Sequence, residues 1–137
     1  MPGSRATSSC TRIATPTGDR LVANISAGDL VWTVDAPGHM IAAPVQRTVR
    51  RPTPGPHLML QLVLADGRTL IAAGAHPDVH GHDLSELRVG QAYDGSTVAS
   101  TAWVVSTAIA TYDILPSGLT GAYWANDILV GSTLTGD

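Results

Sequence analysis

Glycine and proline residues interrupt this chain at short intervals, and their spacing restricts its fold more than any other feature. Fourteen glycines and nine prolines divide the 137 residues into short stretches rich in β-branched and aliphatic side chains. Such stretches suit β-strands, and the segments between them suit turns. The chain has no lysine and a single glutamate, Glu86, so it is poor in residues that favour surface helices. The sequence therefore predicts an all-β fold of short strands.

The expected strands lie between turn signals. Residues 58–64 and 69–73 flank Asp66-Gly67, a dipeptide typical of tight turns, and this arrangement predicts a β-hairpin. The other expected strands are residues 11–15, 20–25, 30–34, 41–50, 98–105, 108–115 and 121–130.

Two further segments are expected to break the strand pattern. The proline-rich residues 51–56 do not suit a central strand, because proline lacks the N–H group that the hydrogen-bond ladder needs. One helical turn is expected in residues 83–89, where Leu84 and Leu87 are three positions apart.

Size and charge argue against several classes of protein. A chain of 137 residues fits one domain, and a net charge of −3 provides no basic surface for nucleic acid. No apolar run reaches the roughly 18 residues that a membrane-spanning helix needs. Residues 1–9 are small and polar and lack the apolar core of a secretory signal, so they are interpreted as a short flexible leader.

The only cysteine, Cys10, stands where this leader ends and the first expected strand begins. A lone cysteine is often a small buried side chain, which is the simplest interpretation. A thiol at this junction is also suitably placed to attack the peptide bond that precedes it. Both interpretations stay open on composition alone.

Five segments of the chain carry short motifs in order. Residues 10–33 read C-T-R-I-A-T-P-T-G-D and later I-S-A-G-D-L-V-W-T, and residues 66–77 end in A-A-G-A-H-P. Residues 87–91 read L-R-V-G-Q, residues 111–114 read T-Y-D-I, and residues 123–130 read Y-W-A-N-D-I-L-V. Together these motifs resemble the sequence blocks of Hint domains, the self-cleaving domains of inteins and Hedgehog-type proteins, and most of all the bacterial intein-like type. The resemblance extends from Cys10 to about Val130.

The resemblance implies a pseudo-symmetric, horseshoe-shaped all-β domain of short strands, formed by residues 10–137. Its first and last strands would lie side by side near the centre and bring Cys10 close to His76 and Asp113. Residues 1–9 would be an N-extein-like segment or a remnant of cloning. The domain would be a monomer that acts on its own chain, without a cofactor, a metal ion, nucleic acid or a membrane.

The resemblance also implies a reaction. The Cys10 sulfur would attack the Ser9 carbonyl carbon and move the acyl chain from nitrogen to sulfur, which forms a thioester. His76 would protonate the leaving amide nitrogen, and Asp113 would accept the thiol proton or orient the site. Water, a thiol or an amine nucleophile would resolve the thioester, in a single-turnover self-cleavage rather than multiple-turnover catalysis.

Two departures from the Hint pattern affect this expectation. Ala73 stands where Hint domains carry threonine, three residues before the histidine, and so removes a hydroxyl expected to contact the scissile bond between Ser9 and Cys10. Val130-Gly131-Ser132-Thr133 replaces the intein ending V-H-N and the residue after it. Because the Ser132 side chain has no amide nitrogen, it cannot cyclise as asparagine does, and full splicing is not expected.

Two other functions stay open from the sequence. One is a degenerate Hint-like scaffold that binds or connects without reacting. The other is a metal-dependent hydrolase, because residues 76–83 read H-P-D-V-H-G-H-D and offer three histidines and two aspartates as ligands for Zn²⁺ or Cu²⁺. The spacing H-x₃-H-x-H does not match the helical zinc motif H-E-x-x-H, so a solvated polar loop is the alternative interpretation of these residues.

Overall fold

The computed structural model describes residues 11–134, so Ser9 and Cys10, the expected scissile bond and nucleophile, lie outside the described residues. In chain order the elements are β1 (Arg12–Ile13), β2 (Arg20–Leu21), η3 (Val22–Asn24), β3 (Leu30–Val34), β4 (Met40–Pro52), β5 (His57–Leu64), β6 (Thr69–Ala72), η4 (Leu84–Glu86), β7 (Ala92–Tyr93), β8 (Ser96–Ser106), β9 (Ala110–Pro116), β10 (Tyr123–Ala125) and β11 (Ile128–Val130). The two η elements are single 3₁₀ turns. No helix within residues 11–134 is long and apolar enough to span a membrane.

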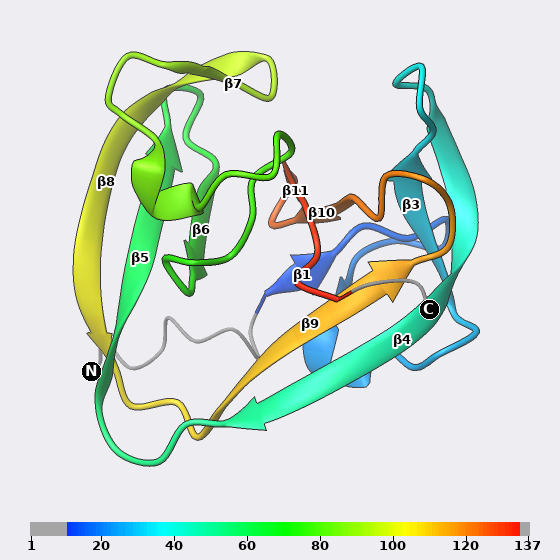
Figure 1. The fold of residues 1–137 in the computed structure, drawn as a ribbon, viewed down its shortest axis with the longest axis horizontal. Coiled ribbons are helices and arrows are strands. Elements are labelled where there is room, and N and C mark those ends of the chain that lie inside the picture. The colour runs from blue at the N-terminus through cyan, green and yellow to red at the C-terminus, as the bar shows by residue number, and fades with distance from the viewer. Residues whose placement is uncertain (1–10, 135–137) are drawn as a thin grey trace.

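Three antiparallel sheets arrange these strands as an open horseshoe (Figure 1). The strand orders are β3-β4-β9, β6-β5-β8-β7 and β11-β10-β1-β2. In Figure 1, β3 and β4 form one arm, β5, β6 and β8 form the other, and β1, β10 and β11 lie between the two arms. The expected all-β horseshoe is therefore confirmed.

Several strand boundaries follow the sequence pattern closely. The strand expected at residues 30–34 is β3, and the expected hairpin is β5 with β6, where Gly67 has the positive φ of 97° that the turn requires. The expected helical turn is η4. Pro52 belongs to β4, but it is the last residue of that strand and pairs with Ala110 at the end of the ladder, where a missing N–H costs little.

The strand expected at residues 20–25 is wrong beyond Leu21. The chain turns there into η3, and the Ile25 N–H donates to the Val22 carbonyl at 3.2 Å. Val22 and Ile25 are both buried, and a 3₁₀ turn with three residues per turn places residues three apart on the same side. The burial of two apolar side chains thus overrides the strand propensity of this segment.

The C-terminal segment also differs from expectation. Residues 121–130, expected as one strand, form the hairpin of β10 and β11, in which Asn126 and Asp127 have φ of 50° and 65°. Positive φ at both central residues is the signature of a two-residue hairpin turn. β1 pairs with β10 through Ile13 and Ala125, and β11 lies beyond β10, so the first and last strands are one strand apart rather than adjacent.

The side chain of Asn126 ties this hairpin to two other parts of the fold. Its Oδ1 accepts a hydrogen bond from the Arg12 N–H at 2.8 Å, and its Nδ2 donates to the Thr69 carbonyl at 3.1 Å. These two bonds hold β10 and β11 against β1 and against the edge strand β6. The hairpin is thereby placed at the centre of the horseshoe.

Arg68 makes a second set of links between turns. Its guanidinium lies 2.8 Å from carboxylates of both Asp66 and Asp94, and it donates to the Asp127 carbonyl at 2.8 Å. The turn between β5 and β6 is thus joined to the turns of two other hairpins. These acidic partners raise the pKa of Arg68, which keeps the guanidinium charged.

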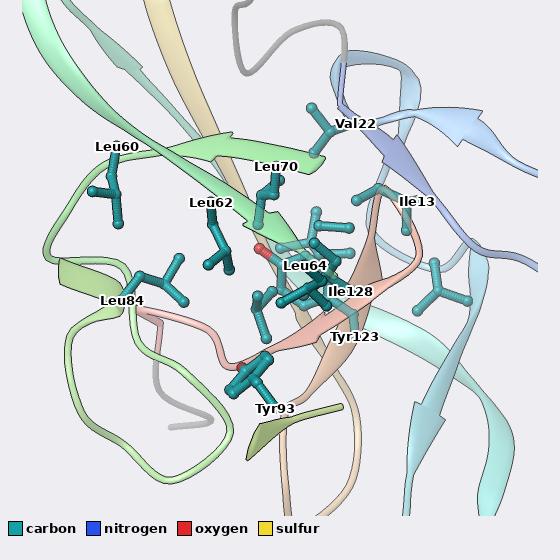
Figure 2. Packing of buried hydrophobic residues seen from close by; sticks show 14 of the residues in the cluster. Ile13, Val22, Leu60, Leu62, Leu64, Leu70, Leu84, Tyr93, Tyr123 and Ile128 are labelled. Carbon is teal, nitrogen blue, oxygen red and sulfur yellow. The ribbon is translucent and has the colours of Figure 1, made fainter. Parts of the chain in front are cut away.

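The core lies between the arms of the horseshoe (Figure 2). Leu60, Leu62 and Leu64 point inward because alternate residues of β5 share one face. They pack with side chains from every part of the described chain, among them Ile13, Val22, Val31, Leu70, Leu84, Tyr93, Tyr123 and Ile128. The core therefore joins the two arms to the central sheet that carries β1 and β10.

Candidate functional site

A cavity of about 130 Å³ opens where the central sheet meets β6 and β9. Its wall combines apolar side chains with a few polar groups, namely Thr11, Ile13, Val22, Arg51, Leu70, Ile71, Ala72, Ala73, Ala75, His76, Thr111, Tyr112, Asp113, Tyr123, Ala125, Val130 and Thr133. Residues from both ends of the described chain therefore meet in one small space.

The backbone of His76 is held in a tight loop that follows β6. Its N–H donates to the Ala73 carbonyl at 3.0 Å, and its carbonyl accepts from the Leu84 N–H at 2.8 Å. Gly74 lies beneath Trp103, and a Cβ at this position would come within 2.4 Å of the indole ring. A side chain at this position would displace Trp103, so glycine lets the loop before His76 pass close to the indole ring.

The imidazole of His76 makes contacts that indicate its tautomer. The Nε2 atom lies 2.8 Å from the Gly131 carbonyl oxygen. A carbonyl oxygen only accepts, so Nε2 must carry the proton. In the neutral ring, Nδ1 then has a free lone pair and is the nitrogen left for a reacting group.

The carboxylate of Asp113 is buried, with 2% of the residue exposed, on β9. Its Oδ1 accepts from the Ile114 N–H at 2.8 Å and from the Tyr123 hydroxyl at 2.6 Å. Its Oδ2 accepts from the Thr133 N–H at 2.7 Å, from the Thr133 hydroxyl, and at 3.5 Å from the Ser132 hydroxyl. A carboxylate has about four lone-pair sites, so these five donors use all of its capacity.

Tyr123 connects the two candidate residues. Its hydroxyl oxygen lies 3.4 Å from His76 Nε2 and donates its proton to Asp113. The His76 and Tyr123 rings meet edge to face, with centroids 6.3 Å apart and an interplanar angle of 88°. Burial, and then the neighbouring Asp113 carboxylate, raise the pKa of Tyr123 well above its usual value, so the hydroxyl stays protonated.

Solved structures with the same architecture are inteins and an intein-like domain. A bacterial intein-like domain from Clostridium thermocellum aligns with a TM-score of 0.76 and 23% identity, over 88% of this chain and 94% of that domain. A DnaB intein from Synechocystis sp. PCC 6803 aligns with a TM-score of 0.75 and 19% identity, over 94% and 99%. The gp41-1 intein aligns at 0.69 and 24%, over 92% and 97%. The chain has the Hint fold. No protein-family model and no curated protein sequence matches it.

The Hint fold of this chain brings together the expected residues that lie within the described part of the chain. His76 and Asp113 line the same cavity and are linked through Tyr123. Thr11, the residue after Cys10 in the sequence, lines that cavity as well and is buried. Cys10 and Ser9 themselves lie outside the described residues.

The two departures from the Hint pattern also lie at the cavity. Ala73 is exposed and forms part of its wall, so no apolar packing explains the missing hydroxyl. The segment that replaces the intein ending supplies the Gly131 carbonyl to His76 and the Thr133 N–H to Asp113. This segment therefore holds both candidate residues in place.

The loop of residues 76–83 is organised by Asp78. The Asp78 carboxylate is buried and accepts from the N–H groups of His80 at 2.7 Å and His82 at 3.0 Å. Within residues 11–134, no group of three or more His, Cys, Asp or Glu side chains is placed to hold a metal ion. The Asp78 carboxylate thus holds the loop by accepting hydrogen bonds from the backbone N–H groups of the loop.

Tyr123 is the residue of the site that sequence reasoning missed. It appears in the Y-W-A-N-D-I-L-V motif, where an aromatic residue in a short strand reads as core. A signal was present, because a buried tyrosine hydroxyl needs a hydrogen-bond partner and Asp113 is the expected polar residue of the neighbouring motif.

Replacing Asp113 by alanine should destabilise the domain strongly. The change leaves the buried Tyr123 hydroxyl and the Thr133 N–H without an acceptor. Hydrogen bonds to charged groups contribute about 1.5–3 kcal/mol each, so the free energy of unfolding should fall by at least about 3 kcal/mol. Urea denaturation followed by circular dichroism measures this change. Asp19→Ala, at an exposed turn, is the control and should stay within about 0.5 kcal/mol of the parent; equal midpoints for all three proteins would contradict the prediction.

Proposed function

We propose that this Hint domain cleaves its own chain at the bond between Ser9 and Cys10. The Cys10 sulfur attacks the Ser9 carbonyl carbon, the bond from that carbon to the Cys10 nitrogen breaks, and a thioester forms. Water, a thiol or an amine then attacks the thioester carbonyl and releases the preceding segment. The reaction uses each molecule once and needs no cofactor.

The observation that carries this proposal is the convergence of His76, Asp113 and Thr11 on one cavity. A single peptide bond separates Thr11 from Cys10 in the sequence. A histidine held by its backbone and a carboxylate from a distant strand therefore face the start of the domain. Nucleophilic catalysis commonly uses such a set, with a base near the nucleophile and a further group that orients the base.

His76 moves the proton in this proposal. The Nδ1 lone pair takes the proton from the Cys10 thiol, and the resulting thiolate attacks. Nδ1–H then returns the proton to the Cys10 nitrogen as the carbon–nitrogen bond breaks, which makes the amine a better leaving group. The bond from Nε2 to the Gly131 carbonyl supports this assignment, because it leaves Nδ1 free for the transfer.

Asp113 orients the site in this proposal rather than accepting the thiol proton. Both of its oxygens already accept hydrogen bonds, from Ile114, Tyr123 and Thr133. A carboxylate whose lone pairs already accept hydrogen bonds has little room to approach the thiol and serves as an anchor. The sequence left two roles open for Asp113, namely accepting the thiol proton and orienting the site. This arrangement of hydrogen bonds favours the orienting role.

The proposed reaction stops short of splicing. Splicing in inteins ends with an asparagine that cyclises, and Ser132 stands at that position here. The Ser132 hydroxyl lies 3.5 Å from Asp113, and its side chain contains no nitrogen. A partner fused after Thr133 therefore stays attached.

The missing hydroxyl at Ala73 favours a second candidate function, a Hint-like scaffold that no longer reacts. One donor to a developing oxyanion is typically worth about 10²–10³-fold in rate. The two functions differ in a single measurement, namely whether the purified chain releases residues 1–9.

Dithiothreitol or hydroxylamine should release residues 1–9 and leave a fragment that begins at Cys10. Either nucleophile attacks the thioester carbonyl, so the mass of the larger product identifies the cleaved bond. Intact mass spectrometry over a time course measures the release. Cys10→Ala should abolish it, because the chain contains no other thiol. Release at the parent rate from Cys10→Ala would exclude the thioester mechanism.

Replacing His76 by alanine should slow the cleavage by about 10²–10⁴-fold, the usual range for positioned acid–base catalysis. His80→Ala is the matched control, since His80 belongs to the same loop, is exposed, and bonds to Asp78 only through its backbone. Circular dichroism checks that both variants fold. Equal losses in the two variants would argue against a specific role for His76. They would instead favour a metal site that both histidines share.

Threonine at position 73 should accelerate the cleavage about tenfold, below the roughly 10²–10³-fold of an optimised oxyanion donor. Ala73 is exposed at the cavity wall, so the added hydroxyl is not buried without a partner. Ala73→Val supplies the same volume without the hydroxyl and should leave the rate unchanged. The rate of leader release and a thermal melt are measured together. An equal acceleration in both variants would mean that the side-chain volume at position 73, and not a hydroxyl donor, determines the rate.

A further inference from the structure

The Tyr123 hydroxyl, on β10, lies within hydrogen-bond distance of both His76 and Asp113. It has one proton, and Asp113 Oδ1 receives it at 2.6 Å. The lone pairs of the same oxygen therefore face His76 Nε2 at 3.4 Å. The direction of both bonds follows from the carboxylate, which accepts and does not donate.

We propose that Tyr123 is a positioning residue that, together with the Gly131 carbonyl, holds the tautomer and the orientation of His76 by linking its Nε2–H to the Asp113 carboxylate. This inference rests on the proposed function in one respect: it takes His76 as the group that transfers the proton. The effect of Tyr123 on the His76 tautomer does not depend on cleavage and can be measured separately.

Two acceptors surround Nε2, and both select the same tautomer. Nε2 carries one hydrogen, which it donates to the Gly131 carbonyl at 2.8 Å and shares, over the longer distance of 3.4 Å, with the Tyr123 oxygen. A proton on Nδ1 instead would leave the Nε2 lone pair facing two oxygen lone pairs. The edge-to-face contact of the two rings further restricts rotation of the imidazole.

The order of the bonds gives Asp113 an indirect route to His76. The negative carboxylate polarises the Tyr123 hydroxyl, and the oxygen becomes a better acceptor for Nε2–H. This acceptor stabilises the imidazolium that forms when Nδ1 takes up a proton. Tyr123 does not touch the reacting atoms in this scheme, and it acts through His76.

Tyr123→Phe is the informative variant, because it keeps the ring in the core and in contact with His76 while removing the hydroxyl. Asp113 Oδ1 still accepts from the Ile114 N–H in this variant. Tyr93→Phe is the matched control. Tyr93 is also buried in the core, and its hydroxyl donates to the Leu129 carbonyl at 2.6 Å and accepts from the Val79 N–H at 3.1 Å.

Nitrogen-15 NMR of the full chain with labelled histidine reads the tautomer, because protonated and unprotonated ring nitrogens resonate far apart. The His76 signals are assigned by their loss in His76→Gln. In the parent and in Tyr93→Phe, Nε2 should be the protonated nitrogen in the neutral ring. In Tyr123→Phe, only the Gly131 carbonyl still accepts from Nε2, so the Nδ1–H tautomer should become detectable beside the Nε2–H form.

Leader release is measured on the same three proteins. Losing tautomer control costs a catalytic triad about 10⁴-fold, and because the Gly131 carbonyl still accepts from Nε2, we expect a smaller loss of roughly 10- to 100-fold in Tyr123→Phe. Tyr93→Phe should cleave at the parent rate once the fraction of folded protein is taken into account.

An unchanged His76 tautomer in Tyr123→Phe would overturn the proposal, as would equal slowing in Tyr93→Phe, which would mark a structural effect of any lost core hydroxyl. A parent chain that releases no leader, but in which Tyr123→Phe still shifts the tautomer, would refute the self-cleavage function and support the positioning role. The two failures are therefore distinguishable.

Discussion

The Asp113 carboxylate is the group around which the centre of the molecule is organised. It lies in the interior, where an ionised group without partners would be very costly. Its donors come from its own strand, from β10 and from the segment after β11. Three stretches of chain therefore have to be in place before the charge is compensated, and this requirement couples the cavity to the fold.

Side chains in turns connect other parts of the fold in a similar way. Arg68 joins the β5–β6 turn to Asp94 and to the Asp127 carbonyl, and Asn126 joins β1 to β6. Short strands bury little surface, and two-residue strands such as β1 and β2 have few ladder bonds of their own. Polar side chains that cross between hairpins supply the connections that the short ladders lack.

Much of this architecture could be predicted from the sequence. The alternation in residues 30–34 and the Asp66-Gly67 turn are local signals, and both elements form as expected. The motifs around His76 and Asp113 predicted that these residues share a site, and the structure places them at one cavity. Residue 10 lies outside the described part of the chain, so its role stays a prediction.

The remaining features depend on contacts that a one-dimensional pattern does not contain. Residues 20–25 have strand propensity, and only the packing of Val22 and Ile25 into the core explains the 3₁₀ turn. Tyr123 looks like a core aromatic until the register of β10 against β1 places its hydroxyl beside Asp113. The Asn126-Asp127 turn was hidden because neither residue is glycine, although both have positive φ.

The contacts of Gly131 and Thr133 with His76 and Asp113 have a consequence for timing during synthesis. Thr11 leaves the ribosome long before Thr133, and at 5–20 residues per second the interval between them is about 6–24 s. Throughout that interval the nascent chain lacks the carbonyl that orients His76 and two of the donors that hold Asp113. A domain that cleaves as proposed therefore has an incomplete site while it is being translated, and cleavage reaches its full rate only after Thr133 has emerged.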